Sequence, residues 1–181
     1  MPNRRKLLAG GCILLLAALV LIYVNATRPR PVLAHPETAQ LVYVRVDFPE
    51  DSAEKNFYWA PATPEEEETA QAILDYLGQC QEKRVKILKG PTSAKPQKEK
   101  YVLGGSGNWP FMTIMVNLSA RESRGILLGP SEVPEGPVRA DFTYDASASS
   151  PRLWGRPGIL LEPDALRSYV LEVLDLPEDL L

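Results

Sequence analysis

The chain has 181 residues, of which 45% are hydrophobic, 24% are charged and two are cysteine, and its formal net charge is −3. These values fit one globular domain and exclude a disulfide-rich miniprotein and a wholly disordered chain. The mild acidity argues against a protein that coats nucleic acid, so we expect no nucleic-acid partner.

The clearest signal is an uncharged apolar stretch near the N-terminus. Leu7 to Val24 follows three consecutive basic residues at positions 4–6. At about 1.5 Å rise per residue a helix of this length is roughly 27 Å long, enough to cross a thin hydrocarbon core. The basic residues favour an N-terminus in the cytoplasm. We therefore expect a cytoplasmic segment (1–6), a transmembrane signal anchor (7–26) in the cell membrane, and an extracytoplasmic remainder.

Two other treatments of this segment are open. Val24-Asn25-Ala26 supplies the small residues of a cleavage site, so that cutting before Thr27 would release a secreted protein. Ala9-Gly10-Gly11-Cys12 superficially resembles a bacterial lipobox, but it lacks the Leu expected at the first position. The apolar run also continues well past Cys12, which disfavours a lipid anchor there.

The region after the anchor divides into a Pro-rich stalk and a folded domain. Residues 27–40 show no apolar period and predict an extended stalk. The folded domain is expected to span 41–177, followed by a short C-terminal tail (178–181). Without residues 1–34 the chain keeps 15 basic and 23 acidic residues, a net charge of −8.

Two amphipathic helices are predicted in the domain. Thr63, Pro64 and Glu66 form a capping box with proline at the first helical position, and apolar residues at 70, 73, 74 and 77 share one face. The run of glutamates at 65–68 favours the positive end of this helix, which explains it without a metal. A terminal helix starts near Pro163 and is expected to stop at Pro177.

Short strands are predicted between and around these helices, at 41–46, 56–60, 85–88, 101–103, 111–118, 126–128, 138–144, 153–154 and 159–161. Their clustering favours an α+β fold with a mainly antiparallel sheet over alternating βαβ units. The predicted fold class is therefore an N-terminal transmembrane helix followed by one small α+β domain with two amphipathic helices.

Charge and aromatic residues supply the candidate binding sites. Residues 83–100 hold seven bases and one acid, whereas residues 37–82 hold eleven acids and two bases. This basic segment is either solvated surface or a contact for an anionic protein or envelope polymer. Aromatic side chains either fill the core or stack on sugar rings. The candidate binding residues are Lys89, Lys95, Lys98, Lys100, Trp59 and Trp109.

Catalytic and metal-binding patterns are weak. The single histidine, His35, lies in the predicted stalk, and one exported cysteine, Cys80, cannot build a usual zinc site. Cys80 is interpreted as a small apolar residue, with an intermolecular disulfide as the alternative. We predict no catalytic residues, metal or cofactor.

The sequence therefore favours a non-enzymatic membrane-anchored domain that binds a protein or a cell-envelope polymer. One alternative is a glycan-acting enzyme that uses carboxylates such as Asp141 and Asp145. The other is a structural subunit of a membrane assembly. The oligomeric state is not predicted.

Overall fold

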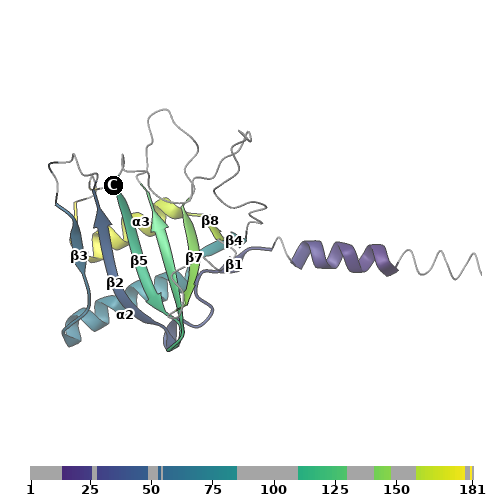
Figure 1. Cartoon of the computed structure of the whole chain (residues 1–181), viewed down its shortest axis with the longest axis horizontal. Helices are drawn as coiled ribbons and strands as arrows, with labels where there is room; N and C mark the ends of the chain where they lie inside the picture. The colour runs from purple at the N-terminus through teal and green to yellow at the C-terminus, as the bar shows by residue number, and fades with distance from the viewer. Residues whose placement is uncertain are drawn as a thin grey trace, which may run out of the picture.

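A computed structural model of the chain describes residues 14–25, 28–48, 53, 55–84, 110–129, 141–147, 158–177 and 180. Eight strands form one sheet in the order β1-β4-β8-β7-β6-β5-β2-β3, and each neighbouring pair is antiparallel (Figure 1). This confirms the predicted α+β fold with an antiparallel sheet. The strands are β1 (Arg30–Pro31), β2 (Gln40–Asp47), β3 (Phe57–Trp59), β4 (Gln81–Arg84), β5 (Phe111–Asn117), β6 (Glu122–Leu128), β7 (Phe142–Ser147) and β8 (Gly158–Leu160).

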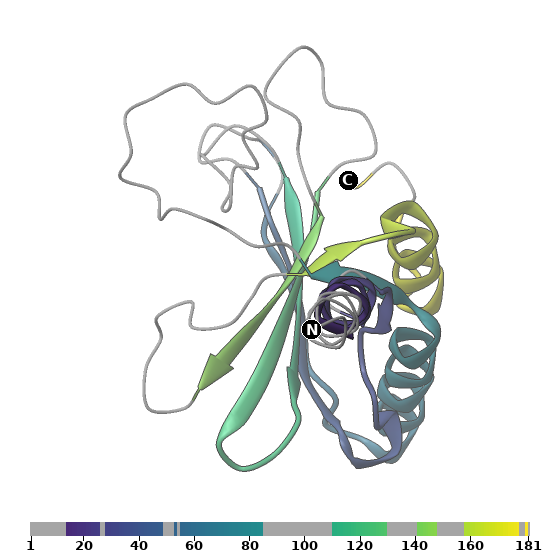
Figure 2. The same cartoon turned by 90° about the vertical axis from the view of Figure 1, so that its right-hand side faces the viewer.

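Two α-helices, α2 (Pro64–Gln79) and α3 (Pro163–Val173), lie on the same side of the sheet, as Figure 2 shows. We call this side the covered face and the opposite side the open face. Side chains alternate between the faces because successive residues of a strand point in opposite directions. In β2, Val44 and Val46 are fully buried towards the helices, whereas Arg45 between them is exposed on the open face.

The hydrophobic core fills the space between the covered face and the helices. Each helix contributes its apolar stripe, and the central strands contribute alternate residues. The principal members are Val44, Val46, Met112, Ile114, Val116, Ile126 and Leu128 from the sheet, and Ala70, Ile73, Leu74, Leu77, Leu166, Val170 and Leu171 from the helices.

The predicted start of α2 is confirmed in detail. The Thr63 side chain accepts a hydrogen bond from the Glu66 backbone N–H, and the Glu66 carboxylate accepts one from the Thr63 backbone N–H. The backbone N–H of Ala62 donates to the same carboxylate. These bonds hold the pKa of Glu66 below its usual value.

The terminal helix ends earlier than predicted. Helix α3 stops at Val173 rather than at Pro177. Asp175 adopts a left-handed conformation (φ 52°), the Leu176 N–H donates to the Leu171 carbonyl, and the Asp175 N–H donates to the Glu172 carbonyl. This is a Schellman termination. An aspartate occupies the position where glycine is usual, so the end of the helix could not be recognised from a glycine.

The strand predictions at 41–46, 56–60, 111–118 and 159–161 correspond to β2, β3, β5 and β8. The strand predicted at 126–128 is the end of β6, which already begins at Glu122, with Ser123 opposite Asn117. Strand β4 at Gln81–Arg84 was not predicted. The predictions at 85–88, 101–103 and 153–154, and residues 138–140 of another, lie outside the described residues.

Part of the segment 27–40, predicted as an extended stalk, packs with the domain instead, from Arg30 onward. Arg30 and Pro31 of β1 lie opposite Glu82 and Gln81 of β4. Val32 and Leu33 are 0% and 2% exposed and belong to the core. A short 3₁₀ helix, η1 (Pro36–Thr38), follows. Burial of the apolar side chains of Val32 and Leu33 in the core stabilises the packing of this proline-rich segment against the domain.

Residues 14–25 are helical, and their large apolar side chains are exposed, from 73% for Leu14 to 53% for Val24. Within the described part of the chain, no helix has both the length and the apolarity to span a membrane. The transmembrane anchor over 7–26 therefore stays a prediction.

Candidate functional site

The open face carries a row of side chains across four strands. Tyr43 of β2, Met115 of β5, Gly125 of β6 and Tyr144 of β7 lie opposite one another in successive strand pairs. The Tyr144 ring lies over Gly125, where an added Cβ would be only 2.5 Å from the Tyr144 Oη atom. The absence of a side chain at Gly125 thus allows Tyr144 to lean towards the middle of the sheet.

Tyr58 of edge strand β3 extends this row. Its side chain is 63% exposed, and its ring centroid lies 5.6 Å from that of Tyr43, with the two planes tilted by 32°. This distance and tilt are within the range for interacting aromatic rings. The pair leaves aromatic surface available to a further group, since Tyr58 remains largely in solvent.

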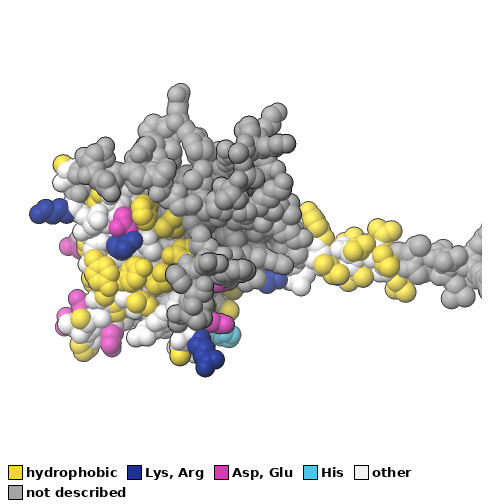
Figure 3. Space-filling model, in the orientation of Figure 1, with side chains coloured by type: hydrophobic (Ala, Val, Ile, Leu, Met, Phe, Trp, Pro, Cys, Tyr) yellow, Lys and Arg dark blue, Asp and Glu magenta, His cyan; other side chains and the backbone are white. Residues whose placement is uncertain are grey.

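A charged pair stands beside the two rings. Arg45 Nε lies 2.7 Å from Asp47 Oδ2, and the side chains are 45% and 17% exposed. We call Tyr43, Tyr58, Arg45 and Asp47 the tyrosine cluster. Figure 3 shows hydrophobic side chains gathered on the described part of this face, with basic and acidic side chains next to them.

The electrostatic environment links Tyr144 to this cluster. Burial raises the pKa of Tyr144 above its ordinary value, proximity to Tyr43 raises it further, and Arg45 lowers it. The phenol of Tyr144 is therefore neutral near pH 7, and it acts as a hydrogen-bonding group rather than a charge.

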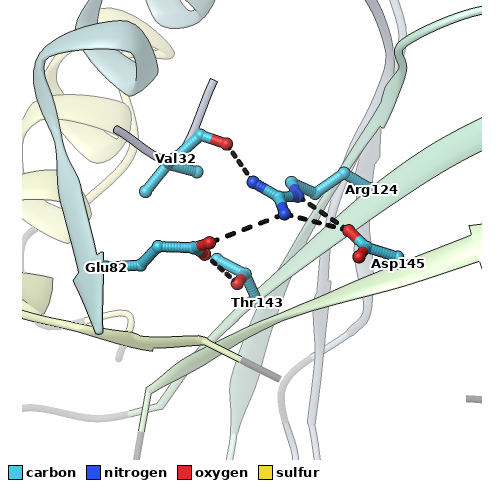
Figure 4. Close-up of polar contacts among 5 residues, drawn as sticks. All are labelled: Val32, Glu82, Arg124, Thr143 and Asp145. Carbon is cyan, nitrogen blue, oxygen red and sulfur yellow. Dashed lines mark hydrogen bonds and ion pairs between the residues drawn. The ribbon is translucent and has the colours of Figure 1, made fainter. Parts of the chain in front are cut away.

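The covered face carries a different polar group, a buried ionic cluster (Figure 4). Arg124 of β6 contacts Asp145 Oδ1 through Nη2 at 2.9 Å and through Nε at 3.0 Å, and its Nη2 lies 3.5 Å from Glu82 Oε1. Its Nη1 donates to the Val32 carbonyl, and the Thr143 hydroxyl donates to Glu82. We call Glu82, Arg124, Thr143 and Asp145 the buried ionic cluster.

This cluster joins the sheet edge to its centre. Glu82 comes from β4, Arg124 from β6, and Thr143 and Asp145 from β7. The Glu82 carboxylate occupies the space above Gly158 of β8, where a Cβ would lie 2.6 Å from Glu82 Cδ. Asp145 is 41% exposed, but Glu82, Thr143 and Arg124 are buried and paired, so these three serve the fold and offer little to a ligand.

A second buried arginine, Arg167 of α3, contacts two aspartates. Its Nη1 contacts Asp164, and its Nη2 lies 3.5 Å from Asp141 Oδ1. Asp141 Oδ1 also accepts a hydrogen bond of 2.7 Å from the Gly129 N–H. The two carboxylates considered for glycan hydrolysis, Asp141 and Asp145, thus each contact a buried arginine.

The predicted site residues fall mainly outside the described chain. Lys89, Lys95, Lys98, Lys100 and Trp109 are among these. Trp59 of β3 is partly buried and packs against the hydrophobic core, on the face opposite to its neighbour Tyr58. Tyr58, and not the predicted Trp59, is the residue of this strand that belongs to the tyrosine cluster.

Among the described residues, no group of three His, Cys, Asp or Glu side chains could hold a metal ion. His35 is exposed and lies 3.2 Å from Glu37. Cys80 is a half-buried free cysteine that ends α2, and burial is the main cause that raises its pKa to about 11.

Comparison with known proteins does not identify a relative: no family model, curated protein or solved structure matches the chain. The function is therefore inferred from the geometry of the site alone.

Proposed function

We propose that the chain is a non-enzymatic, single-pass membrane protein whose extracytoplasmic domain binds a neutral glycan polymer of the cell envelope through the tyrosine cluster. The observation that carries the proposal is the Tyr43–Tyr58 pair, with ring centroids 5.6 Å apart on the open face and one ring largely in solvent. The anchor part of the proposal rests on the uncharged apolar stretch from Leu7 to Val24 in the sequence.

A glycan fits the chemistry of this cluster. Tyrosine combines an apolar ring, which packs on the C–H face of a sugar, with a hydroxyl that forms hydrogen bonds. Arg45 and Asp47 add donors and acceptors for sugar hydroxyls beside the rings. Among described residues outside the helix, the exposed large hydrophobic side chains are Tyr58 and Leu161. This is less apolar surface than a stable protein interface commonly uses.

Charge favours a neutral polymer over an anionic one. Without residues 1–34 the net charge is −8, from 15 basic and 23 acidic residues, so the domain repels polyanions at long range. The basic segment with Lys89, Lys95, Lys98 and Lys100 stays a second candidate contact. Replacing Lys95, Lys98 and Lys100 by Glu should abolish recovery of an anionic partner, and unchanged recovery would remove that candidate.

Binding is tested by retention of the detergent-solubilised full chain on insoluble envelope polysaccharide. Tyr58→Ala should weaken retention about fivefold, because an exposed aromatic contact is worth on the order of 1 kcal/mol. Arg45→Ala should weaken it as well. Leu161→Ala is the matched control, since it removes the other exposed hydrophobic side chain and should leave retention unchanged. Equal retention of Tyr58→Ala and the parent chain would reject the glycan site and turn attention to a protein partner.

The anchor is tested separately, by intact mass of the protein in membrane and medium fractions of its own host. Full-length mass in the membrane supports the anchor. A mass that begins at Thr27, found in the medium, would establish the secreted form instead.

A further inference from the structure

The apolar helix and the folded domain are separated by very few residues. The described helix reaches Asn25, and β1 begins at Arg30. Five steps along an extended chain reach at most about 18 Å. The Arg30 side chain also donates through Nη2 to the Asn25 carbonyl at 3.3 Å. Figure 1 shows the helix projecting beyond the β1 side of the sheet, away from β3.

The side of the sheet next to this helix carries exposed basic residues and an exposed leucine. Arg28, Arg30 and Lys83 are exposed basic residues there. Leu161 is 44% exposed, and its N–H donates to the Gln81 carbonyl of β4 at 3.0 Å. We call Arg28, Arg30, Gln81, Lys83 and Leu161 the β1 edge. Glu162, which follows Leu161, is an exposed acid beside it, so the basic residues remain in excess.

We infer that the β1 edge rests on the bilayer surface and contacts anionic phospholipid headgroups. This inference rests on the membrane anchor of the proposed function. Arginine and lysine bind headgroup phosphates, and an exposed leucine beside β4 suits the boundary between headgroups and acyl chains. The short connection leaves the domain no room to stand far from the membrane.

The order of the strands then sets the height of the tyrosine cluster. Strand β4 is second and β3 is eighth in the sheet, so six strand spacings separate them. At about 4.8 Å each, this amounts to roughly 29 Å. The sheet thus holds Tyr58 at the side away from the membrane, where a surface polymer would meet it.

The inference is tested with the full chain in vesicles of phosphatidylcholine and phosphatidylglycerol that contain a lipid with a spin label on its headgroup. A fluorophore is attached to a single cysteine, from either Gln81→Cys or Tyr58→Cys, in a chain with Cys12→Ala and Cys80→Ala. We expect strong quenching at position 81 and at least severalfold weaker quenching at position 58. Equal quenching at the two positions would overturn the inference.

Lipid contact is distinguished from simple tethering by a linker of about twelve Gly and Ser residues inserted after Ala26, which adds roughly 20 Å of reach. With this linker, quenching at position 81 should persist in vesicles with phosphatidylglycerol and fall at least twofold in pure phosphatidylcholine. Replacing Arg28, Arg30 and Lys83 by Gln should abolish the difference. Equal quenching of the linker chain in both lipids would overturn the headgroup contact.

A carbonate wash separates this inference from the proposed function. A chain that the wash releases has no anchor, which would overturn both. A chain that stays in the vesicles with an unquenched probe at position 81 would overturn only the contact of the β1 edge, and the anchor would stand.

Discussion

The two faces of the sheet each carry an arginine paired with an aspartate, and the two pairs differ in what surrounds them. On the covered face, Arg124 lies 2.9 Å from Asp145, and its side chain is 10% exposed. On the open face, Arg45 lies 2.7 Å from Asp47, and its side chain is 45% exposed. The aspartates are exposed in the opposite order, 41% for Asp145 and 17% for Asp47, so the two pairs differ in the solvent exposure of the arginine. Solvent screens the Arg45 guanidinium and leaves it accessible, whereas the Arg124 guanidinium is enclosed.

The strongest way to break this comparison is to remove each arginine in turn. Arg124→Ala leaves the Glu82 carboxylate buried without its cation and should lower the free energy of unfolding by about 3–5 kcal/mol. Arg45→Ala should lower it by at most about 1 kcal/mol. Urea titration of the detergent-solubilised chain measures both. Equal losses would mean that burial does not separate the two pairs.

The covered face extends into the segment that follows the apolar helix, and a second substitution tests this extension. Leu33→Ala should destabilise the domain by about 2–5 kcal/mol, because Leu33 is 2% exposed and its loss leaves a cavity. Leu161→Ala, at a residue 44% exposed, should change stability by about 0.5 kcal/mol or less. A small loss of stability for Leu33→Ala would show that residues 28–40 do not pack with the domain.

Two glycines allow a further comparison of the two faces. Gly158 lies beneath Glu82 on the covered face, and Gly125 lies beneath Tyr144 on the open face. At Gly158 a new Cβ would meet the buried Glu82 carboxylate and also lie 2.7 Å from Thr143 Oγ1, so Gly158→Ala should cost about 1–3 kcal/mol. At Gly125 the new atom meets the far end of the Tyr144 ring, which can turn aside. Gly125→Ala should therefore cost less in a thermal melt. A larger loss at Gly125 would show that Tyr144 is held as firmly as Glu82.

Much of this fold was predictable from local patterns, and the exceptions share a cause. The capping box at Thr63 and Glu66, the apolar stripe of α2 and the strand over 41–46 were predicted from local patterns, and the structure confirms them. Strand β4 has the sequence Gln-Glu-Lys-Arg, without an apolar residue. It pairs with β1 and β8, and its Glu82 side chain contacts Arg124 and Thr143, so its partners lie far along the chain.

The tyrosine cluster could be predicted only in part. A strand over 56–60 was predicted, with Trp59 as the candidate binding residue, but a period of two does not say which residue faces the helices. That assignment came from the pairing of Tyr58 with Arg45, which places Tyr58 on the open face and Trp59 opposite Val44 on the covered face. The position of Tyr144 near this cluster depends on the pairing of β7 with β6, which sets Tyr144 opposite Gly125. Long-range register therefore decides the site.

The reactivity of Cys80 tests the margin of the covered face. This half-buried thiol packs against the core without being enclosed by it. Burial, and to a lesser degree Glu162, raises its pKa from 9.0 to about 11. At pH 8 the folded chain should then hold about a hundredfold less thiolate than the unfolded chain, and iodoacetamide should react correspondingly slowly. The measurement uses Cys12→Ala with and without urea; equal rates would place the thiol in solvent.

The raised pKa of Cys80 also sets the direction of this residue's contribution to the pH dependence of stability. Since the pKa in the folded state lies above the unfolded value of 9.0, the folded chain retains a proton that the unfolded chain loses at high pH. The contribution of the neutral thiol is therefore complete below pH 9 and is lost as the pH rises through about 11. Glu162→Gln should bring the onset of rapid alkylation to slightly lower pH, while Cys80→Ala should remove this part of the pH dependence. An onset that does not move in Glu162→Gln would leave burial as the whole cause, and would place the carboxylate of Glu162 too far into solvent to act on the thiol.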